Sequence, residues 1–458
     1  MRNGSGMKSI EAVQESLAKI EEVDRAGYQL NSVLAVSEDA MEQAERLDAT
    51  NRELPLQGLP ILIKDNIEAS GLPASAGSLA LADTPVTKDS TIAQRLRAAG
   101  AVIIGATNIS EWANIRSTKS TSGWSAVGGL TANPWKHAHS AGGSSSGSGA
   151  AVGAGITQWA IGSETDGSII CPASLNGCVG IKPTVGSIPR DGMIPISASQ
   201  DSPGPMAQTV AQVATLLDVL TEKNEYRPAV DSDATLRIGI VREWMTPNAG
   251  VTDRFEEAIS KLEKHGISLV EVELTPPASQ ENEDELLVLL YELNEGLRAY
   301  LSKRPGVRVG SLAEVVEFNV HNAASEMQYF GQELFEQALA VQNKRVEYLA
   351  ARERNLHWAD RTLEQGLTDV DVLIGCTYGP AWLSTLGQGD NYEDASWICT
   401  APAIAGTPIG TIPMGLVEGL PVGLGFVSGR HQEAHLIAAM ARAERALDLG
   451  VLKPSFLK

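Results

Sequence analysis

Short apolar, β-branched runs alternate along this chain with amphipathic segments of helical period, and this alternation restricts the fold more than any other feature. Residues 59–63 form such a run, which stops at the polar residues 64–66. A second run, residues 101–104, follows a helix expected over residues 91–99. Alternating strands and helices build layered folds, so the chain is predicted to be an α/β protein.

The rest of the chain shows no break that would divide it. An apolar stripe in residues 10–20 predicts a first surface helix. The most polar stretch, residues 276–285, is expected to be a solvated loop ahead of a helix that starts near Leu286. We find no repeat at a fixed period, so one domain over residues 1–458 is expected, with residues 1–6 interpreted as an expression scar or a disordered N-terminus.

Composition excludes several classes of partner. Apolar residues make up 43% of the chain and charged residues 20%, as in ordinary globular proteins. A net charge of −20 would repel phosphate backbones and anionic lipids, so neither nucleic acid nor membrane is an expected partner. The chain shows no signal peptide or transmembrane stretch, and its four cysteines are scattered. A cytoplasmic protein is expected.

A Gly/Ser run at residues 141–150 allows three interpretations, of which the simplest is a flexible linker. Gly142 and Gly147 have the spacing of a phosphate-binding loop, but Ser148 stands where that motif has a lysine. Ser145 is the central serine of a G-x-S-x-G nucleophile elbow. An elbow needs a strand directly before it, but the residues that precede Ser145 are polar and turn-like. A Ser-His-Asp hydrolase is therefore kept only as the runner-up.

A second serine loop follows a short strand predicted at residues 159–161. It contains Ser168 directly after Gly167, and Lys64 stands at the end of the earlier strand over residues 59–63. A serine after a glycine is by itself usually a turn residue. Two glycine-framed serine loops and a lysine at a strand end together form a Ser/Ser/Lys set.

This set resembles the amidase signature family. The matching motifs are Gly142-Gly143-Ser144-Ser145, Asp166-Gly167-Ser168-Ile169 and Lys64-Asp65. Within the family the chain is most similar to bacterial peptide amidases, which remove the amide from peptide C-termini. The residues behind this narrower resemblance lie at 75–81, 122–126 and 165–168.

The resemblance implies a single large α/β domain in which helices cover both faces of a mixed central sheet. It also implies that Ser168 attacks the substrate and that its proton passes through Ser144 to a neutral Lys64. A cis peptide bond is expected before Ser144. The backbone N–H groups expected to form the oxyanion hole are those of Thr165, Asp166, Gly167 and Ser168.

The expected substrate is a small-molecule or peptide amide without charge near the reacting carbon. Many amidases carry an arginine just after the Gly-Ser-Ile step, but here Ile170 and Cys171 follow, and with Trp112 and Trp124 they are candidates for apolar substrate-binding walls. No cofactor is implied, and no metal site is expected from the histidines. The alternatives are a non-catalytic amidase-fold binding protein and a glutamine-hydrolysing amidotransferase subunit. A monomer or a homodimer is expected.

Overall fold

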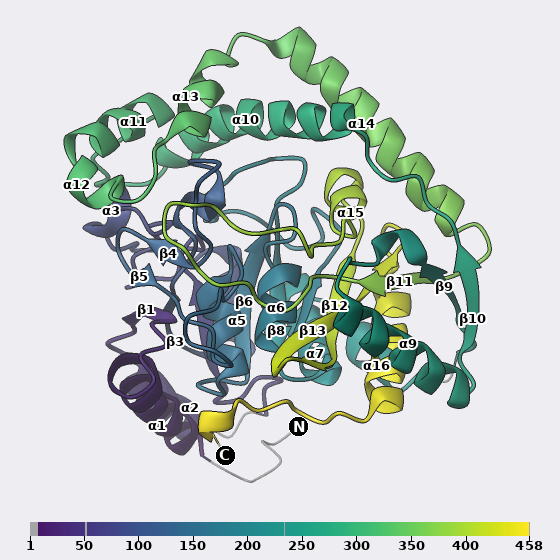
Figure 1. Cartoon of the computed structure of the whole chain (residues 1–458). Helices are drawn as coiled ribbons and strands as arrows, with labels where there is room; N and C mark the ends of the chain where they lie inside the picture. The colour runs from purple at the N-terminus through teal and green to yellow at the C-terminus, as the bar shows by residue number, and fades with distance from the viewer. Residues whose placement is uncertain (1–7, 51–52, 233, 458) are drawn as a thin grey trace.

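A computed structural model describes residues 8–50, 53–232 and 234–457, and within these ranges eleven strands form one sheet (Figure 1). The strand order is β1-β3-β2-β6-β8-β7-β12-β13-β11-β9-β10. The strands are β1 (Val33–Val36), β2 (Pro60–Lys64), β3 (Val102–Thr107), β6 (Trp159–Glu164), β7 (Val179–Lys182), β8 (Ser202–Ala207), β9 (Arg237–Val241), β10 (Ser268–Val272), β11 (Val372–Cys376), β12 (Ile409–Val417) and β13 (Leu420–Ser428). A separate ribbon pairs β4 (Trp124–Ser125) with β5 (Gly129–Leu130). Residues 1–6, interpreted above as an N-terminal extension, lie outside the described residues.

The sheet is mixed, as the family resemblance implied. Strands β3, β2 and β6 run parallel, and so do β11, β9 and β10. Between these groups β8, β7, β12 and β13 pair antiparallel with their neighbours, and β1 closes one edge antiparallel to β3. The predicted α/β class with a mixed central sheet is confirmed.

Helices cover both faces of this sheet, because successive strand residues point to opposite sides. In β2, Ile61 and Ile63 pack into one hydrophobic cluster and Leu62 into another. The helices of the first cluster are α4 (Thr91–Ala98), α7 (Val210–Thr221), α8 (Tyr226–Val230), α9 (Ala249–Lys264) and α16 (Glu433–Leu447). Those on the opposite face are α1 (Ser9–Lys19), α2 (Ala40–Asp48), α5 (Ser146–Gly153), α6 (Ile170–Asn176) and α15 (Thr400–Ala405).

Most local boundaries agree with the sequence patterns. The predicted helix over residues 91–99 is α4, and the Ser90 side chain accepts a hydrogen bond from the backbone N–H of Ala93 at 3.2 Å. The strands predicted at residues 59–63 and 101–104 are the cores of β2 and β3. Local side-chain chemistry therefore determines these elements.

The predicted loop over residues 276–285 is wrong, because helix α10 (Ser279–Leu301) already begins at Ser279. Its first turns are rich in Glu, Gln and Asp, which are tolerated in helices and interact favourably with the helix N-terminus. Glu285 is consequently buried rather than solvated. Helix α10 belongs to a helical layer that arches over one side of the molecule in teal and green (Figure 1). Its other members are α11 (Leu312–His321), α12 (Ala323–Glu326), α13 (Glu333–Ala340) and α14 (Arg345–Gly366).

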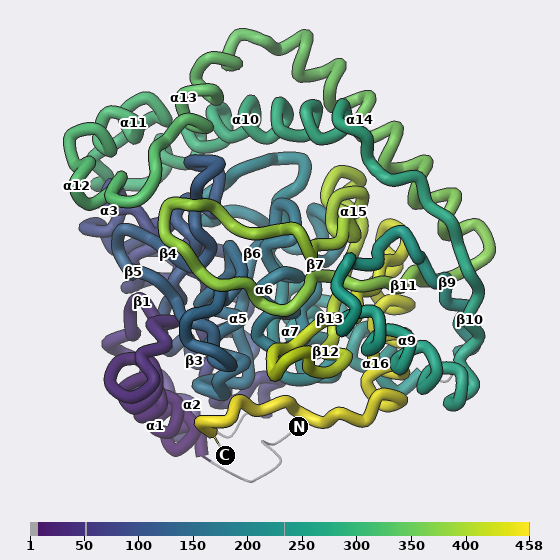
Figure 2. The backbone as a smooth tube through the Cα atoms, viewed as in Figure 1, coloured from purple at the N-terminus to yellow at the C-terminus, as the bar shows by residue number. Residues whose placement is uncertain are grey.

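The segment between β11 and α15 crosses the front of the sheet below this layer (Figure 2).

Within the described ranges, no helix combines the length and the apolar character needed to cross a membrane.

Candidate active site

Lys64 is the last residue of β2 and is fully buried. Its Nζ lies 2.8 Å from Ser144 Oγ, and 2.9 Å from both the Oγ and the backbone oxygen of Ser163. Burial lowers the Lys64 pKa to about 7, although the charges of Glu164 and Asp201 oppose this shift. A lysine with this pKa is available as a neutral base at physiological pH.

Ser144 reaches Lys64 from a loop that leads into α5. The peptide bond between Gly143 and Ser144 is cis, and Ser144 is fully buried. A Cβ at Gly143 would collide with the side chains of Ser110 and Ser122. The loop is thus closely packed, unlike a flexible linker.

The neighbouring serines of this loop use their hydroxyls for structure. Ser145 Oγ donates to the backbone oxygen of Ser163 at 3.0 Å and accepts from its N–H at 3.2 Å. Ser146 Oγ donates to the Gly142 carbonyl, and Ser148 Oγ donates to the backbone oxygen of Ile161 at 3.1 Å. No strand directly precedes Ser145 in the described structure. The described structure therefore does not meet the requirement of a nucleophile elbow at Ser145.

Ser168 lies in the loop between β6 and α6 and is partly exposed. The Glu164 carboxylate accepts hydrogen bonds from the N–H groups of Ile169 at 2.7 Å and Ile170 at 2.9 Å, which holds the chain just after the serine. The Ser168 carbonyl accepts from the N–H of Ser145 at 3.1 Å, so the two serine loops are in direct contact. The hydrogen bonds of the described residues include none between the hydroxyls of Ser144 and Ser168.

Thr165 is held by a buried carboxylate from a third segment. Its Oγ1 donates to Asp201 Oδ1 at 2.7 Å, while Asp201 Oδ2 accepts from the N–H groups of Ile196 and Ser197 at 2.9 and 3.0 Å. Burial raises the Asp201 pKa to about 6. Asp201 thereby connects the loop before Ser168 to the segment at residues 194–197.

A small cavity opens beside Ser144. The residues that line it are Asn66, Ala113, Ser144, Ser163, Glu164, Thr165, Met193, Ile194, Ile196 and Asp201. No lysine or arginine is among these described lining residues. The cavity therefore combines an apolar side, made largely by Met193, Ile194 and Ile196, with an acidic side, and none of its described lining residues supplies a cation for an anionic ligand.

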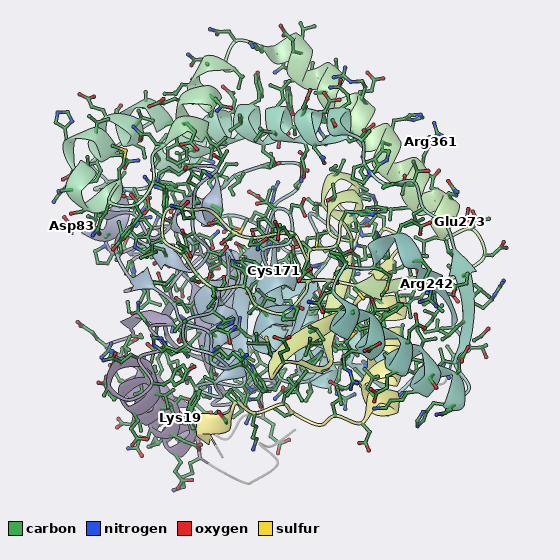
Figure 3. All side chains as sticks on the ribbon, in the orientation of Figure 1. Lys19, Asp83, Cys171, Arg242, Glu273 and Arg361 are labelled. Atoms are coloured by element: carbon green, nitrogen blue, oxygen red, sulfur yellow. The ribbon has the colours of Figure 1, made fainter. Side chains whose placement is uncertain are left out.

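The four residues expected to form substrate walls are not among those lining this cavity. Trp112, Trp124, Ile170 and Cys171 are all buried in hydrophobic packing. Trp124 packs edge-on against Tyr329 and Phe330, with ring centroids 5.4 and 5.0 Å apart. Cys171 lies near the centre of the molecule, whereas Lys19, Asp83 and Arg361 mark its margin (Figure 3).

Lys182, the other buried lysine near this site, bonds to the backbone instead. Its Nζ donates to the carbonyl of Thr407 at 2.6 Å, close to the end of α15. Its positive charge also lowers the Glu164 pKa, which burial raises. Among the described residues, no group of three His, Cys, Asp or Glu side chains is arranged to hold a metal ion.

The fold and the buried Lys64–Ser144 contact define an α/β protein with a serine–lysine site suited to hydrolysis, and comparison with known proteins agrees with this class. The family profile named Amidase matches residues 11–437, and the chain belongs to this family. It is accordingly an amidase, a hydrolase of amide carbon–nitrogen bonds.

Two solved structures of peptide amidases are similar to this chain. The native peptide amidase from Stenotrophomonas maltophilia is 38% identical, with a TM-score of 0.90 over 99% of this chain and 96% of that one. The peptide amidase PAM in complex with the competitive inhibitor chymostatin is also 38% identical, with a TM-score of 0.92 over the same shares.

Two curated sequence relatives are named as amidotransferase subunits and not as peptide amidases. A glutamyl-tRNA(Gln) amidotransferase subunit of Exiguobacterium sibiricum is 35% identical over 97% of this chain and 94% of its own length. The protein of the same name from Methanosarcina barkeri is 32% identical over 93% and 92%. The comparisons therefore show the amidase family without deciding the substrate.

Several residues around the site were not predicted from the sequence. Ser163 and Asn66, whose Nδ2 donates to Ser163 Oγ at 2.9 Å, could have been found as polar residues at the ends of strands β6 and β2. Asp201 and Glu285 had no such signal, because their partners lie in segments remote in the sequence.

Proposed function

We propose that this amidase hydrolyses neutral carboxamides, in particular the C-terminal carboxamides of peptides and amino-acid amides, and releases ammonia. The observation that carries the proposal is the 2.8 Å contact between Lys64 Nζ and Ser144 Oγ in a fully buried setting. A buried lysine bonded to a serine, in a loop that contacts the loop of a second, partly exposed serine, can generate a nucleophile without histidine.

In the proposed reaction, Ser168 Oγ attacks the amide carbon. Its proton moves to Ser144 as the Ser144 proton moves to the neutral amine of Lys64. The leaving nitrogen of the tetrahedral intermediate then takes a proton back from Lys64 through Ser144 and departs as ammonia, and an acyl-enzyme remains. Water attacks the acyl-enzyme by the same proton path, which frees the carboxylic acid and restores the Ser168 hydroxyl.

The negative charge that develops on the carbonyl oxygen needs backbone donors. We assign the oxyanion hole to the N–H groups of Thr165, Asp166, Gly167 and Ser168. The positive φ of 74° at Gly167 turns its peptide in a direction that other residues rarely adopt. The same loop is anchored just after Ser168, where the N–H groups of Ile169 and Ile170 donate to the Glu164 carboxylate.

The charge of the cavity supports a neutral substrate. Glu164 and Asp201 line it, and no lysine or arginine among the described lining residues would pair with a carboxylate. A bound carboxylate would forgo a charge-assisted hydrogen bond worth roughly 1.5–3 kcal/mol. The apolar side chains of Met193, Ile194 and Ile196 suit a peptide side chain instead.

Hydrolysis of glutamine within an amidotransferase is the second candidate function. It is favoured by the relatives that are named as amidotransferase subunits, which are 32% and 35% identical to this chain. Free glutamine carries an α-carboxylate, which the acidic cavity would repel. The peptide amidase structures, at 38% identity, support the first candidate.

We further propose that the enzyme works in the cytoplasm as a monomer or homodimer, without a nucleic-acid partner. All four cysteines are free and buried, as suits a reducing compartment. The net charge of −20 opposes binding to tRNA.

A substrate panel tests the proposal. N-protected dipeptide amides, free glutamine, short aliphatic amides and long-chain fatty amides are compared by ammonia release and product mass. We expect kcat/KM for the dipeptide amides to exceed that for glutamine at least about tenfold, with internal peptide bonds left intact. A preference for glutamine or for fatty amides would overturn the proposed substrate.

A further inference from the structure

Ser163, near the end of β6, contacts the amine of Lys64 through two different oxygens. Lys64 Nζ lies 2.9 Å from Ser163 Oγ and 2.9 Å from the Ser163 carbonyl oxygen, and its third hydrogen-bond partner among the described residues is Ser144 Oγ at 2.8 Å. All three residues are buried. The ammonium form of a lysine has three N–H donors, so these three oxygens satisfy it completely.

Asn66 fixes the direction of the Ser163 hydroxyl. Its Nδ2 donates to Ser163 Oγ at 2.9 Å, and its Oδ1 lies 3.3 Å from the same oxygen as an acceptor for the hydroxyl proton. The backbone of Ser163 is held as well, because Ser145 Oγ donates to its carbonyl at 3.0 Å and accepts from its N–H at 3.2 Å. Ser163 Oγ therefore presents a lone pair, and not its proton, to Lys64.

The neutral form of Lys64 has only two N–H donors and one lone pair. The carbonyl oxygen of Ser163 can only accept, and Ser163 Oγ accepts because its proton is directed to Asn66. Both N–H bonds are therefore directed at Ser163, and of the three oxygens only Ser144 Oγ has a proton left to give. The lone pair of the amine consequently faces Ser144 Oγ at 2.8 Å, the contact through which a proton would pass.

We propose that Ser163 is a positioning residue for the reaction, because its two oxygens occupy both N–H bonds of the neutral Lys64 amine and so turn the lone pair toward Ser144. The inference rests on the proposed function, since it takes Lys64 as the base. An amine free to rotate would direct its lone pair elsewhere for part of the time, and the proton transfer from Ser144 would lose its alignment. Asn66 acts indirectly, through the Ser163 hydroxyl.

The charged groups that act on Lys64 are the carboxylates of Glu164 and Asp201, which raise its pKa against the larger effect of burial. Their own pKa values are raised by burial, that of Asp201 to about 6, and neither side chain is hydrogen-bonded to Ser163 in the described structure. Ser163→Ala removes one of the three acceptors of the ammonium form, which lowers the Lys64 pKa further. The acid limb of the rate should therefore move to lower pH, by roughly one pH unit.

The test compares Ser163→Ala with Ser148→Ala, which removes another buried hydroxyl bonded to β6. Ser148 Oγ donates to the Ile161 carbonyl at 3.1 Å and has no described hydrogen bond to Lys64. Two rates are followed against pH, carboxamide hydrolysis and covalent inactivation by a fluorophosphonate, and the second needs no amide substrate. In S163A we expect the plateau of both rates to fall about ten- to a hundredfold with little change in KM, while the acid limb moves to lower pH. S148A should match the wild type.

Double variants separate positioning from general damage to the fold. If Ser163 acts through Lys64, adding Ser163→Ala to Lys64→Ala should slow labelling by the fluorophosphonate no further, whereas damage to the fold would slow it in both backgrounds. Asn66→Ala should lower the plateau severalfold in the wild type but not in S163A, because Asn66 acts through the Ser163 hydroxyl.

A plateau and an acid limb of S163A that coincide with those of the wild type for both rates would overturn the inference. Equal slowing by S163A in the wild type and in the Lys64→Ala enzyme would overturn it as well. If S163A does not fold, a wild-type plateau in N66A decides against the inference equally well. Failure of the proposed function gives different results, namely unchanged labelling of the Lys64→Ala enzyme or a substrate panel that favours glutamine or fatty amides.

Discussion

The charge of Lys64 determines the reactivity of the site at the scale of single residues. Burial disfavours the ammonium form, whereas Glu164 and Asp201 favour it, and the balance leaves a pKa of about 7. The amine accepts a proton from Ser144 only when it is neutral, that is, above this pKa. Activity should therefore be present above about pH 7 and decrease as the pH falls through this value.

Replacing Glu164 by glutamine tests this account of the base. A single carboxylate oxygen of Glu164 accepts both backbone hydrogen bonds, so the amide oxygen of glutamine can keep them. Loss of the negative charge should lower the Lys64 pKa further, and the acid limb of kcat/KM should move to lower pH. Asp201→Asn should shift it in the same direction. An acid limb that stays in place in both variants would show that it does not report Lys64.

Site residues that belong to a short, recognisable sequence pattern were predictable, and those outside such a pattern were not. Lys64 ends an apolar strand and Ser144 stands in a glycine-rich loop, and both patterns are visible within a few residues of sequence. The hydrogen bond between Thr165 and Asp201 joins separate segments of the chain, and a single sequence contains no record of such pairing. The tryptophans were expected as apolar substrate walls because they flank the segment that leads into the Ser144 loop, yet packing buries both of them.

At the scale of elements, an unusual turn between β3 and β4 packs against the helical layer through the contact of Trp112 with Phe335 of α13. Trp112, Ala113 and Asn114 all have positive φ, at 48°, 53° and 70°, and Ala113 lines the cavity. Such backbone costs of order 1–3 kcal/mol per residue and persists only where surrounding contacts impose it. Here Glu111 and Arg116 flank the turn, and their fully buried side chains lie 3.0 Å apart. Arg116 also donates to the Gly331 carbonyl at 3.1 Å, near α13.

Removing Arg116 should therefore destabilise the fold. Arg116→Leu leaves Glu111 buried without its partner, a change that typically costs about 3–5 kcal/mol. The matched control is Arg308→Leu, because Arg308 forms an exposed ion pair with Asp83 at 2.7 Å. That pair should contribute no more than about 1 kcal/mol. Urea unfolding measures both variants, and equal losses of stability would contradict a structural role for the buried pair.

The ends of helices and strands could be predicted from the sequence where the polar residues are exposed and the apolar residues are buried. Strand β2 and helix α4 combine apolar faces with clear end signals, and both were located correctly. The start of α10 was misplaced because its first turns are polar, as a loop would be, although Glu285 within them is buried. Polarity alone does not distinguish a solvated loop from a helix whose acidic residues are buried in the protein interior.

At the scale of the whole molecule, the sequence predicted the class but not the arrangement. The alternation of strands and helices indicated an α/β fold, and the family resemblance implied a mixed sheet. The strand order places β8 between β6 and β7, and β13 between β12 and β11. This order depends on contacts between distant strands, which local patterns do not encode. It brings the ends of β2 and β6 together and thereby unites Lys64 with Ser163.

The central claim, that Ser168 is the nucleophile served by Ser144 and Lys64, is tested most directly by covalent labelling. A fluorophosphonate is added to the wild type and to the variants Ser168→Ala, Ser145→Ala and Lys64→Ala, and the adduct is located by intact mass and peptide mapping. We expect one adduct, on Ser168, in the wild type and in S145A, no adduct in S168A, and much slower labelling in K64A. An adduct on Ser145 would instead support the nucleophile-elbow hydrolase, and unchanged labelling of K64A would remove Lys64 from the mechanism.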